Sequence, residues 1–104
     1  MKQMLQLSKP PEAVFACDDQ MALGAISAVN ESGKRVPEDI SIIGFDNVLQ
    51  AKYFIPKLTT IAQPRIKMGE AATKLLIDLI EKEGKVEKKK IVFEPELIER
   101  NSCS

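Results

Sequence analysis

Two apolar segments, each ending in acidic residues, constrain the fold of this chain more than any other feature. The first covers residues 13–17 and the second covers residues 40–45, and both lead directly into aspartate. The segment between them has apolar side chains at helical spacing and ends at Gly33, a typical helix stop. A strand, a helix and a second strand in so short a span predict a right-handed βαβ unit with two parallel strands.

The acidic residues that follow these two segments are Asp18, Asp19 and Asp46. Neighbouring parallel strands end at the same edge of a sheet, where α/β proteins bind their ligands. We therefore expect Asp18 and Asp46 to face one crevice, with Gly44 allowing the backbone or a ligand to approach closely. A purely structural interpretation is that the first two aspartates cap a helix and the third opens a turn. It is favoured for Asp19, whereas a shared binding role is favoured for Asp18 and Asp46.

Paired carboxylates at a crevice suit three kinds of chemistry. They can accept hydrogen bonds from a neutral ligand, chelate Mg²⁺ or Ca²⁺, or accept a phosphoryl group. The last two would fit a Mg²⁺-dependent, receiver-like α/β domain. However, no lysine ends a later strand as that pattern requires, and no glycine-rich phosphate loop is present. The sequence therefore favours hydrogen bonding to a small polar ligand, without a metal or a cofactor.

The composition excludes several functions. The 104 residues suffice for one small domain or for part of a larger protein, and 15 basic residues balance 15 acidic ones. This balance gives no electrostatic footprint for nucleic acid or a membrane, and no apolar run is long enough to span a bilayer. The absence of histidine excludes a Ser-His-Asp triad and His-bearing zinc sites. We predict a binding module and not an enzyme, with Cys17 buried and Cys103 exposed.

Further elements follow from the apolar pattern. Residues 1–7 are expected to be the end of a helix, and residues 58–61 a short strand. The longest predicted helix covers residues 65–83, and two short strands are expected at 91–93 and 97–98. Alternation of strands and helices places the chain in the α/β class.

Four segments of the sequence resemble motifs of the LacI/GalR family of transcriptional repressors. Residues 13–25 read AVFACDDQMALGA, which resembles A-[IV]-F-x-x-N-D-x-x-A-x-G-A, and residues 36–46 read VPEDISIIGFD, which resembles V-P-x-D-[IV]-S-V-x-G-[FY]-D. Residues 56–64, PKLTTIAQP, resemble P-x-L-T-T-[IV]-x-Q, and residues 97–102, LIERNS, resemble L-[IV]-x-R-x-S. The four motifs occur in the family's order and span nearly the whole chain.

The resemblance implies the C-terminal part of an effector-binding core, a fragment of a type I periplasmic-binding-protein-like fold with a parallel, three-layer αβα sheet. Residues 1–63 and 88–104 would form the C-terminal subdomain. Residues 64–87 would be a helix and crossover that pack in the N-terminal subdomain, so the apolar face of this helix needs a covering partner here. The implied function is effector binding and dimerisation in a cytoplasmic repressor. In the family, operator DNA is bound by an N-terminal helix-turn-helix domain, which these residues do not contain.

The resemblance also implies roles for single residues. Asp46 would hydrogen-bond the effector, a sugar or a purine, and Asp18 and Gln63 would contribute. Many family members have asparagine at the position of Asp18, which would also supply an amide donor. A secreted sugar-binding protein of an uptake system is an alternative on the same fold. The family dimerises through segments whose matching residues could also be ordinary core: Leu23, Ile26, Tyr53, Phe54 and Ile55.

Overall fold

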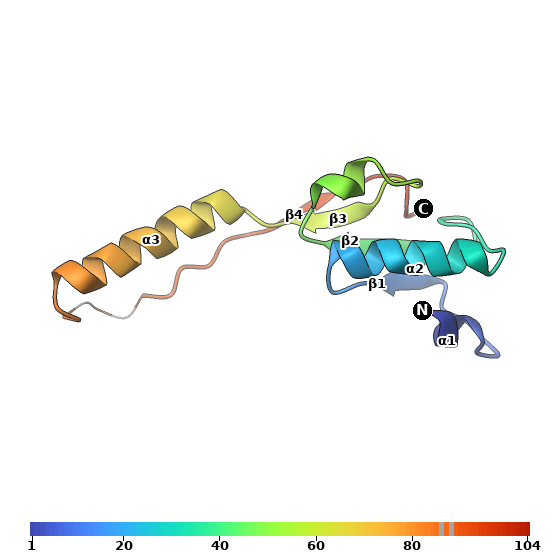
Figure 1. Ribbon diagram of the computed structural model, residues 1–104, viewed down its shortest axis with the longest axis horizontal. Coiled ribbons are helices and arrows are strands. Elements are labelled where there is room, and N and C mark those ends of the chain that lie inside the picture. The colour runs from blue at the N-terminus through green and yellow to red at the C-terminus, as the bar shows by residue number, and fades with distance from the viewer. Residues whose placement is uncertain (86, 88) are drawn as a thin grey trace. The chain divides into compact units, whose positions relative to one another are not determined.

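The computed structural model describes residues 1–85, 87 and 89–104, and the chain forms two compact units (Figure 1). The first, here called the sheet unit, contains Met1–Ala62 together with Glu96–Ser104. The second, here called the helical unit, is Gln63–Pro95. The first limit lies one residue before the predicted division at 63/64, and the second lies eight residues after the predicted division at 87/88. The assignment of the helical unit to another lobe stays a prediction.

The sheet unit is built on four strands in the order β1 (Ala13–Phe15), β2 (Ser41–Phe45), β3 (Thr59–Ala62) and β4 (Glu96–Ile98). β1 pairs in parallel with β2, and β2 in parallel with β3, whereas β4 runs antiparallel to β3. The predicted α/β class is confirmed. The sheet is mixed, and not wholly parallel, because the chain returns from the helical unit in the opposite direction.

Helix α2 (Asp19–Glu31) covers one face of this sheet, as Figure 1 shows. The buried stripe expected from its sequence is confirmed, and Gly33 ends the helix at a φ of +78°. Ile42 and Leu58 are fully buried in the same core, and Met1 and Leu5, at either end of the short helix α1 (Lys2–Leu5), pack against it. The predicted core stripe of α2 consists of Ala22, Ala25, Ile26 and Val29.

The other face of the sheet is much less covered, which corrects the expectation for the first strand. Phe15 is 61% exposed and meets Phe45 edge to face at a centroid distance of 6.4 Å. β1 is three residues long, so Cys17 lies beyond it and is exposed, whereas Cys103 is half-buried. Gly24 of α2 has open space beside it, because a Cβ placed there would meet no atom within 4 Å.

The C-terminal tail joins β2 to β3 through Ser102, which is fully buried. Its hydroxyl donates to the backbone carbonyl of Ile42 at 2.6 Å and accepts from the backbone N–H of Thr59 at 2.8 Å. The backbone carbonyl of Ser102 also accepts from Ile42 N–H at 2.7 Å. The serine of the last sequence motif therefore has a structural role between the two central strands.

Replacing Ser102 by alanine should destabilise the sheet unit. The change leaves the buried N–H of Thr59 without a partner, and the Ile42 carbonyl keeps only the weaker bond from the Cys103 thiol. An unsatisfied buried group costs about 1–3 kcal/mol. We expect the free energy of unfolding, measured by urea titration, to fall by about 1–3 kcal/mol, because backbone relaxation recovers part of the loss. Ser104→Ala is the matched control, since Ser104 is exposed at the chain end. Equal stabilities of the two variants would contradict the assigned role.

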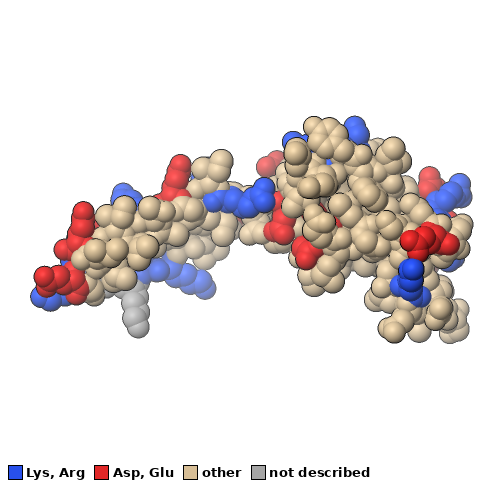
Figure 2. Space-filling view, viewed as in Figure 1, with Lys and Arg blue, Asp and Glu red and all other residues tan. Residues whose placement is uncertain are grey.

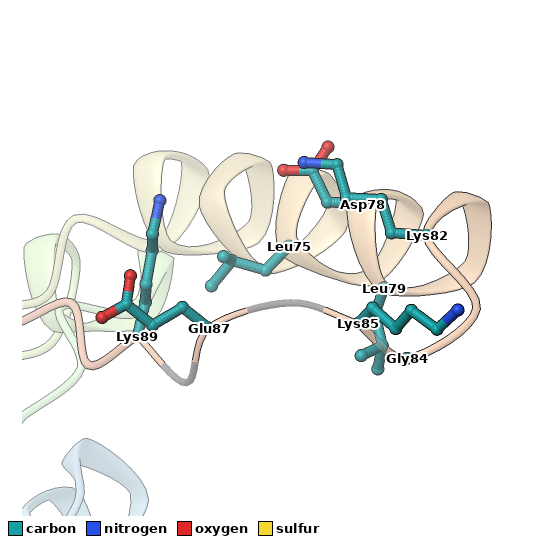
Figure 3. Close-up of a pocket in the computed structure, with 8 residues that line it drawn as sticks. All are labelled: Leu75, Asp78, Leu79, Lys82, Gly84, Lys85, Glu87 and Lys89. Atoms are coloured by element: carbon teal, nitrogen blue, oxygen red, sulfur yellow. The ribbon is translucent and has the colours of Figure 1, made fainter.

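The helical unit contains helix α3 (Arg65–Glu81), two residues shorter than predicted. The structure describes every residue of α3, and none of them is buried. Leu75 and Leu79 point towards the chain that follows the helix and line a groove of about 470 Å³ with it (Figure 3). Leu76 and Ile80 are exposed, so the need for a covering partner remains a prediction. Residues 91–93 form no strand, contrary to expectation.

Candidate functional site

The register of the sheet places Asp18 and Asp46 at matching positions of one edge. Phe15 pairs with Ile43 in the parallel ladder, and each aspartate stands three residues beyond its member of this pair. The backbone N–H of Ala16 donates to the carbonyl of Ile43 at 2.8 Å, so the strands remain paired towards this edge. Both side chains are half-buried. We call this edge, with Asp18, Asp19 and residues 46–48, the acidic rim.

The N-cap of helix α2 is Asp18 and not Asp19. Asp18 is the N-cap of α2, and its carboxylate accepts a hydrogen bond from the backbone N–H of Met21 at 2.7 Å. Such a cap typically contributes about 1 kcal/mol. Asp19 was expected to point into the helix N-terminus, and this prediction is wrong. Asp19 is completely buried and points towards the sheet.

The carboxylate of Asp19 binds two segments distant in sequence. One oxygen accepts from the backbone N–H of Val48 at 2.7 Å, and the other accepts from the hydroxyl of Thr60. The Thr60 oxygen in turn accepts from the backbone N–H of Asn47 at 3.3 Å. A buried charge is costly unless it is hydrogen-bonded, and the helix N-terminus adds favourable partial positive charge. Every buried polar side-chain atom among the described residues has a hydrogen-bond partner.

Asp46 and Asn47 adopt left-handed backbone conformations, with φ of +108° and +53°. For residues other than glycine such a conformation typically costs on the order of 1–3 kcal/mol, and it is concentrated at functional sites. The backbone N–H of Asp46 donates to the backbone carbonyl of Ile61 at 2.8 Å, so the chain remains attached to β3 at this point. The strained turn is therefore attached to β3 through the backbone of Asp46.

Arg100 adds a further contact to the strained turn. Its guanidinium donates to the side-chain oxygen of Asn47 and to the backbone carbonyl of Leu58, both at 2.6 Å. Its backbone N–H donates to the Thr59 hydroxyl at 2.9 Å. The sequence motifs contain Arg100 and Thr60, but nothing in the motifs indicates that these residues support the turn. The contact of Thr60 with Asp19 and that of Arg100 with Asn47 each join residues more than 40 positions apart.

Gln63 belongs to the helical unit, whereas the predicted interface residues belong to the sheet unit. Gln63 follows directly after β3 and is the first residue of the helical unit, so its effector-binding role remains a prediction. Tyr53 and Ile55 are 74% and 86% exposed, next to the short 3₁₀ helix η1 (Leu49–Lys52). Phe54, between them, is half-buried against the core.

Two of the predicted interface residues lie in the core. Ile26 has no exposed surface, and Leu23 is only 8% exposed. A side chain that is completely enclosed by its own chain cannot contact a second chain. The interface role is therefore corrected to a core role for Ile26, and the small exposed part of Leu23 leaves it at most a marginal contact.

The described part of the chain offers little for other kinds of site. In residues 1–85, 87 and 89–104, no three His, Cys, Asp or Glu side chains are grouped so that they could hold a metal ion. Acidic and basic side chains alternate over the visible face in Figure 2, and neither sign forms a large continuous area. No helix in the described residues combines the length and apolar character needed to cross a membrane.

Comparisons with known proteins agree with this architecture. Residues 1–103 match the family model described as periplasmic binding protein-like domain. The chain is 50% identical over 104 residues to the HTH-type transcriptional repressor PurR of Klebsiella pneumoniae, covering 100% of this chain but only 30% of that protein. The chain thus spans about a third of the length of the curated relatives it matches.

Solved structures of similar proteins include liganded regulators. The lac repressor dimer bound to operator and the anti-inducer ONPF is 34% identical, with a TM-score of 0.85 over 98% of this chain and 35% of that one. A LacI family transcriptional regulator from Enterococcus faecium with bound ribose is 38% identical, with a TM-score of 0.83 over 98% of this chain and 37% of that one. The chain belongs to the family of periplasmic binding protein-like domains, in the form found in LacI-type transcriptional regulators.

Proposed function

We propose that this chain is the effector-binding and dimerisation part of a cytoplasmic transcriptional repressor, and that the acidic rim binds an uncharged effector. Asp46 accepts hydrogen bonds from the effector, and Asp18 contributes a second acceptor from the N-terminus of α2. Gln63, the first residue of the helical unit, is proposed as a further effector-binding residue. Neither aspartate serves as a catalytic group in this proposal, so the chain acts by binding.

The observation that carries the proposal is the register of β1 and β2, which puts Asp18 and Asp46 at matching positions of one edge. Ligands of α/β sheets bind at this edge. Two half-buried carboxylates suit a ligand with several hydroxyl or N–H donors, such as a sugar or a purine. The ribose in the similar Enterococcus faecium regulator supports a ligand of this size and polarity. The repressor name of the curated relatives favours a regulator over an uptake protein.

Effector binding would act on DNA through the rest of the protein. Binding across a cleft shifts the equilibrium between two arrangements of the lobes, and the operator affinity shifts with it. The proposed DNA-binding segment lies outside these 104 residues, so the sheet unit alone is not expected to bind an operator.

A chimera tests the proposed role directly. Replacing the matching 104 residues of the Klebsiella pneumoniae PurR by this chain should give a folded repressor that still silences a reporter under its own operator. The unmodified PurR is the positive control, and a PurR truncated before the exchanged segment is the negative control. A chimera that is folded and present at the normal level but gives no repression would contradict the proposal.

The proposed homodimer uses the exposed surface at Tyr53 and Ile55. Charged substitution of Ile55 in an apolar interface should cost about 2 kcal/mol or more, which corresponds to a roughly 30-fold weaker dimer. We expect Ile55→Glu to shift the monomer–dimer equilibrium in sedimentation experiments by that factor, without a change in the free energy of unfolding of the monomer. Leu49→Glu is the control, because Leu49 is also exposed but lies outside the predicted segment. A chain that is monomeric at every concentration would contradict this interface.

A further inference from the structure

Asp19 is the one completely buried charged residue in the described part of the sheet unit, and the proposed function gives it no role. Capping does not explain it, because Asp18 already caps α2. Core packing does not explain it either, since an apolar side chain would fill that volume without a charge to compensate. Its two hydrogen bonds instead lead to the turn that carries Asp46 and to β3.

Three successive backbone N–H groups of this turn are held in place. The first, on Asp46, donates to β3. The second, on Asn47, donates to the Thr60 hydroxyl, and the third, on Val48, donates to Asp19. Because Thr60 itself donates to Asp19, the second and third groups both depend on the same carboxylate.

The held turn also contains two consecutive non-glycine residues in left-handed conformations, Asp46 and Asn47. Such a conformation persists only where the surroundings determine it. Without the carboxylate, Val48 N–H would lose its partner, and the Thr60 hydroxyl that accepts from Asn47 N–H would lose the acceptor that orients it. The backbone at Asp46 could then relax to an ordinary extended conformation.

We propose that Asp19 is a positioning residue, which acts with Thr60 to hold residues 46–48 in the left-handed conformation that presents Asp46 to the effector. The positioning itself is a property of the free protein, and its consequence for affinity rests on the proposed function. Asp19 does not touch the effector. It supports the turn from within the core.

Thr60 provides a matched pair of variants for the test. Thr60→Val keeps the shape of the side chain but removes the hydroxyl, whereas Thr60→Ser keeps the hydroxyl. Amide hydrogen exchange of the 104-residue chain, measured by NMR without ligand, should be slow at Asn47 and Val48 in the original chain. It should rise by ~10-fold or more at these two amides in Thr60→Val and in Asp19→Asn, with the amides of β2 less affected, and Thr60→Ser should restore slow exchange.

The original chain already provides a decisive outcome. If Asn47 and Val48 exchange there as fast as exposed amides, no variant is needed and the inference is overturned. It is overturned equally if the two amides stay as slow in folded Thr60→Val and Asp19→Asn as in the original chain. A general rise over all of β2, to the same extent as in the turn, would indicate a merely structural role and would also contradict positioning.

A ligand arm separates this inference from the proposed function. Hypoxanthine and ribose serve as probes, and the affinity of the probe that binds should fall ~10-fold in Thr60→Val but not in Thr60→Ser. Unchanged affinity in Thr60→Val, despite a loosened turn, would contradict the functional part of the inference. Failure of every probe to bind the original chain would count against the proposed function, while the exchange rates would still decide the positioning.

Discussion

Asp46→Asn should weaken effector binding by about 10- to 100-fold while leaving the free energy of unfolding nearly unchanged. A hydrogen bond to a charged group contributes about 1.5–3 kcal/mol, which corresponds to this range of affinity. Asparagine is the appropriate replacement, because it tolerates the left-handed backbone of Asp46 better than alanine does. Calorimetric titration gives the affinity, and thermal unfolding gives the stability.

Asp46→Gly sharpens the same test. Glycine adopts a φ of +108° without the strain that a side chain brings, and it removes the carboxylate completely. We expect the glycine variant to lose effector binding to the same extent. Normal affinity in both variants would show that Asp46 does not bind the effector. A loss of affinity accompanied by a large loss of stability would assign the residue to structure instead.

Gly44→Ala should destabilise the sheet unit by about 1–3 kcal/mol, the usual cost of forcing an extra carbon into a packed core. A Cβ on Gly44 would overlap the Asp19 carboxylate and would lie 3.0 Å from a methyl carbon of Leu58 and 3.2 Å from the Cβ of Ala22. These neighbours are all buried. In a thermal unfolding experiment, each kcal/mol of lost stability lowers the midpoint temperature by about 4–8 °C for a domain of this size.

Gly24→Ala is the matched control for this prediction. It adds the same methyl group to a glycine of the same unit, but nothing lies within 4 Å of the added carbon. In a helix interior alanine is favoured over glycine by up to about 1 kcal/mol, so this variant should be slightly more stable than the original chain. Equal midpoints for the two variants would contradict the close approach of α2 to β2 at Gly44.

The local elements were predictable because their signals are local. The apolar stripe of α2, the helix stop at Gly33 and the two strands ending in aspartate follow from spacing alone. The parallel pairing of β1 and β2 also followed, since the two strands of a βαβ unit run in the same direction.

The support of the rim was not predictable in the same way. The choice between Asp18 and Asp19 as helix cap depends on where the helix meets the sheet, and adjacent aspartates look alike in a sequence. The contacts of Asp19 with Thr60 and of Arg100 with Asn47 join residues more than 40 positions apart. The exposure of Phe15 and Cys17 could not be predicted from the apolar segment 13–17. It depends on which elements cover the second face of the sheet.

An NMR titration of the 104-residue chain with adenine, hypoxanthine, ribose and cellobiose tests whether the acidic rim binds an uncharged effector, because it detects binding even in the millimolar range. Effector binding at the acidic rim predicts that at least one probe shifts the amide signals of Asp18 and Asp19 together with those of residues 46–48, and that higher probe concentrations are needed for the same shifts in Asp46→Asn. Shifts confined to another part of the chain, or none with any probe, would contradict it.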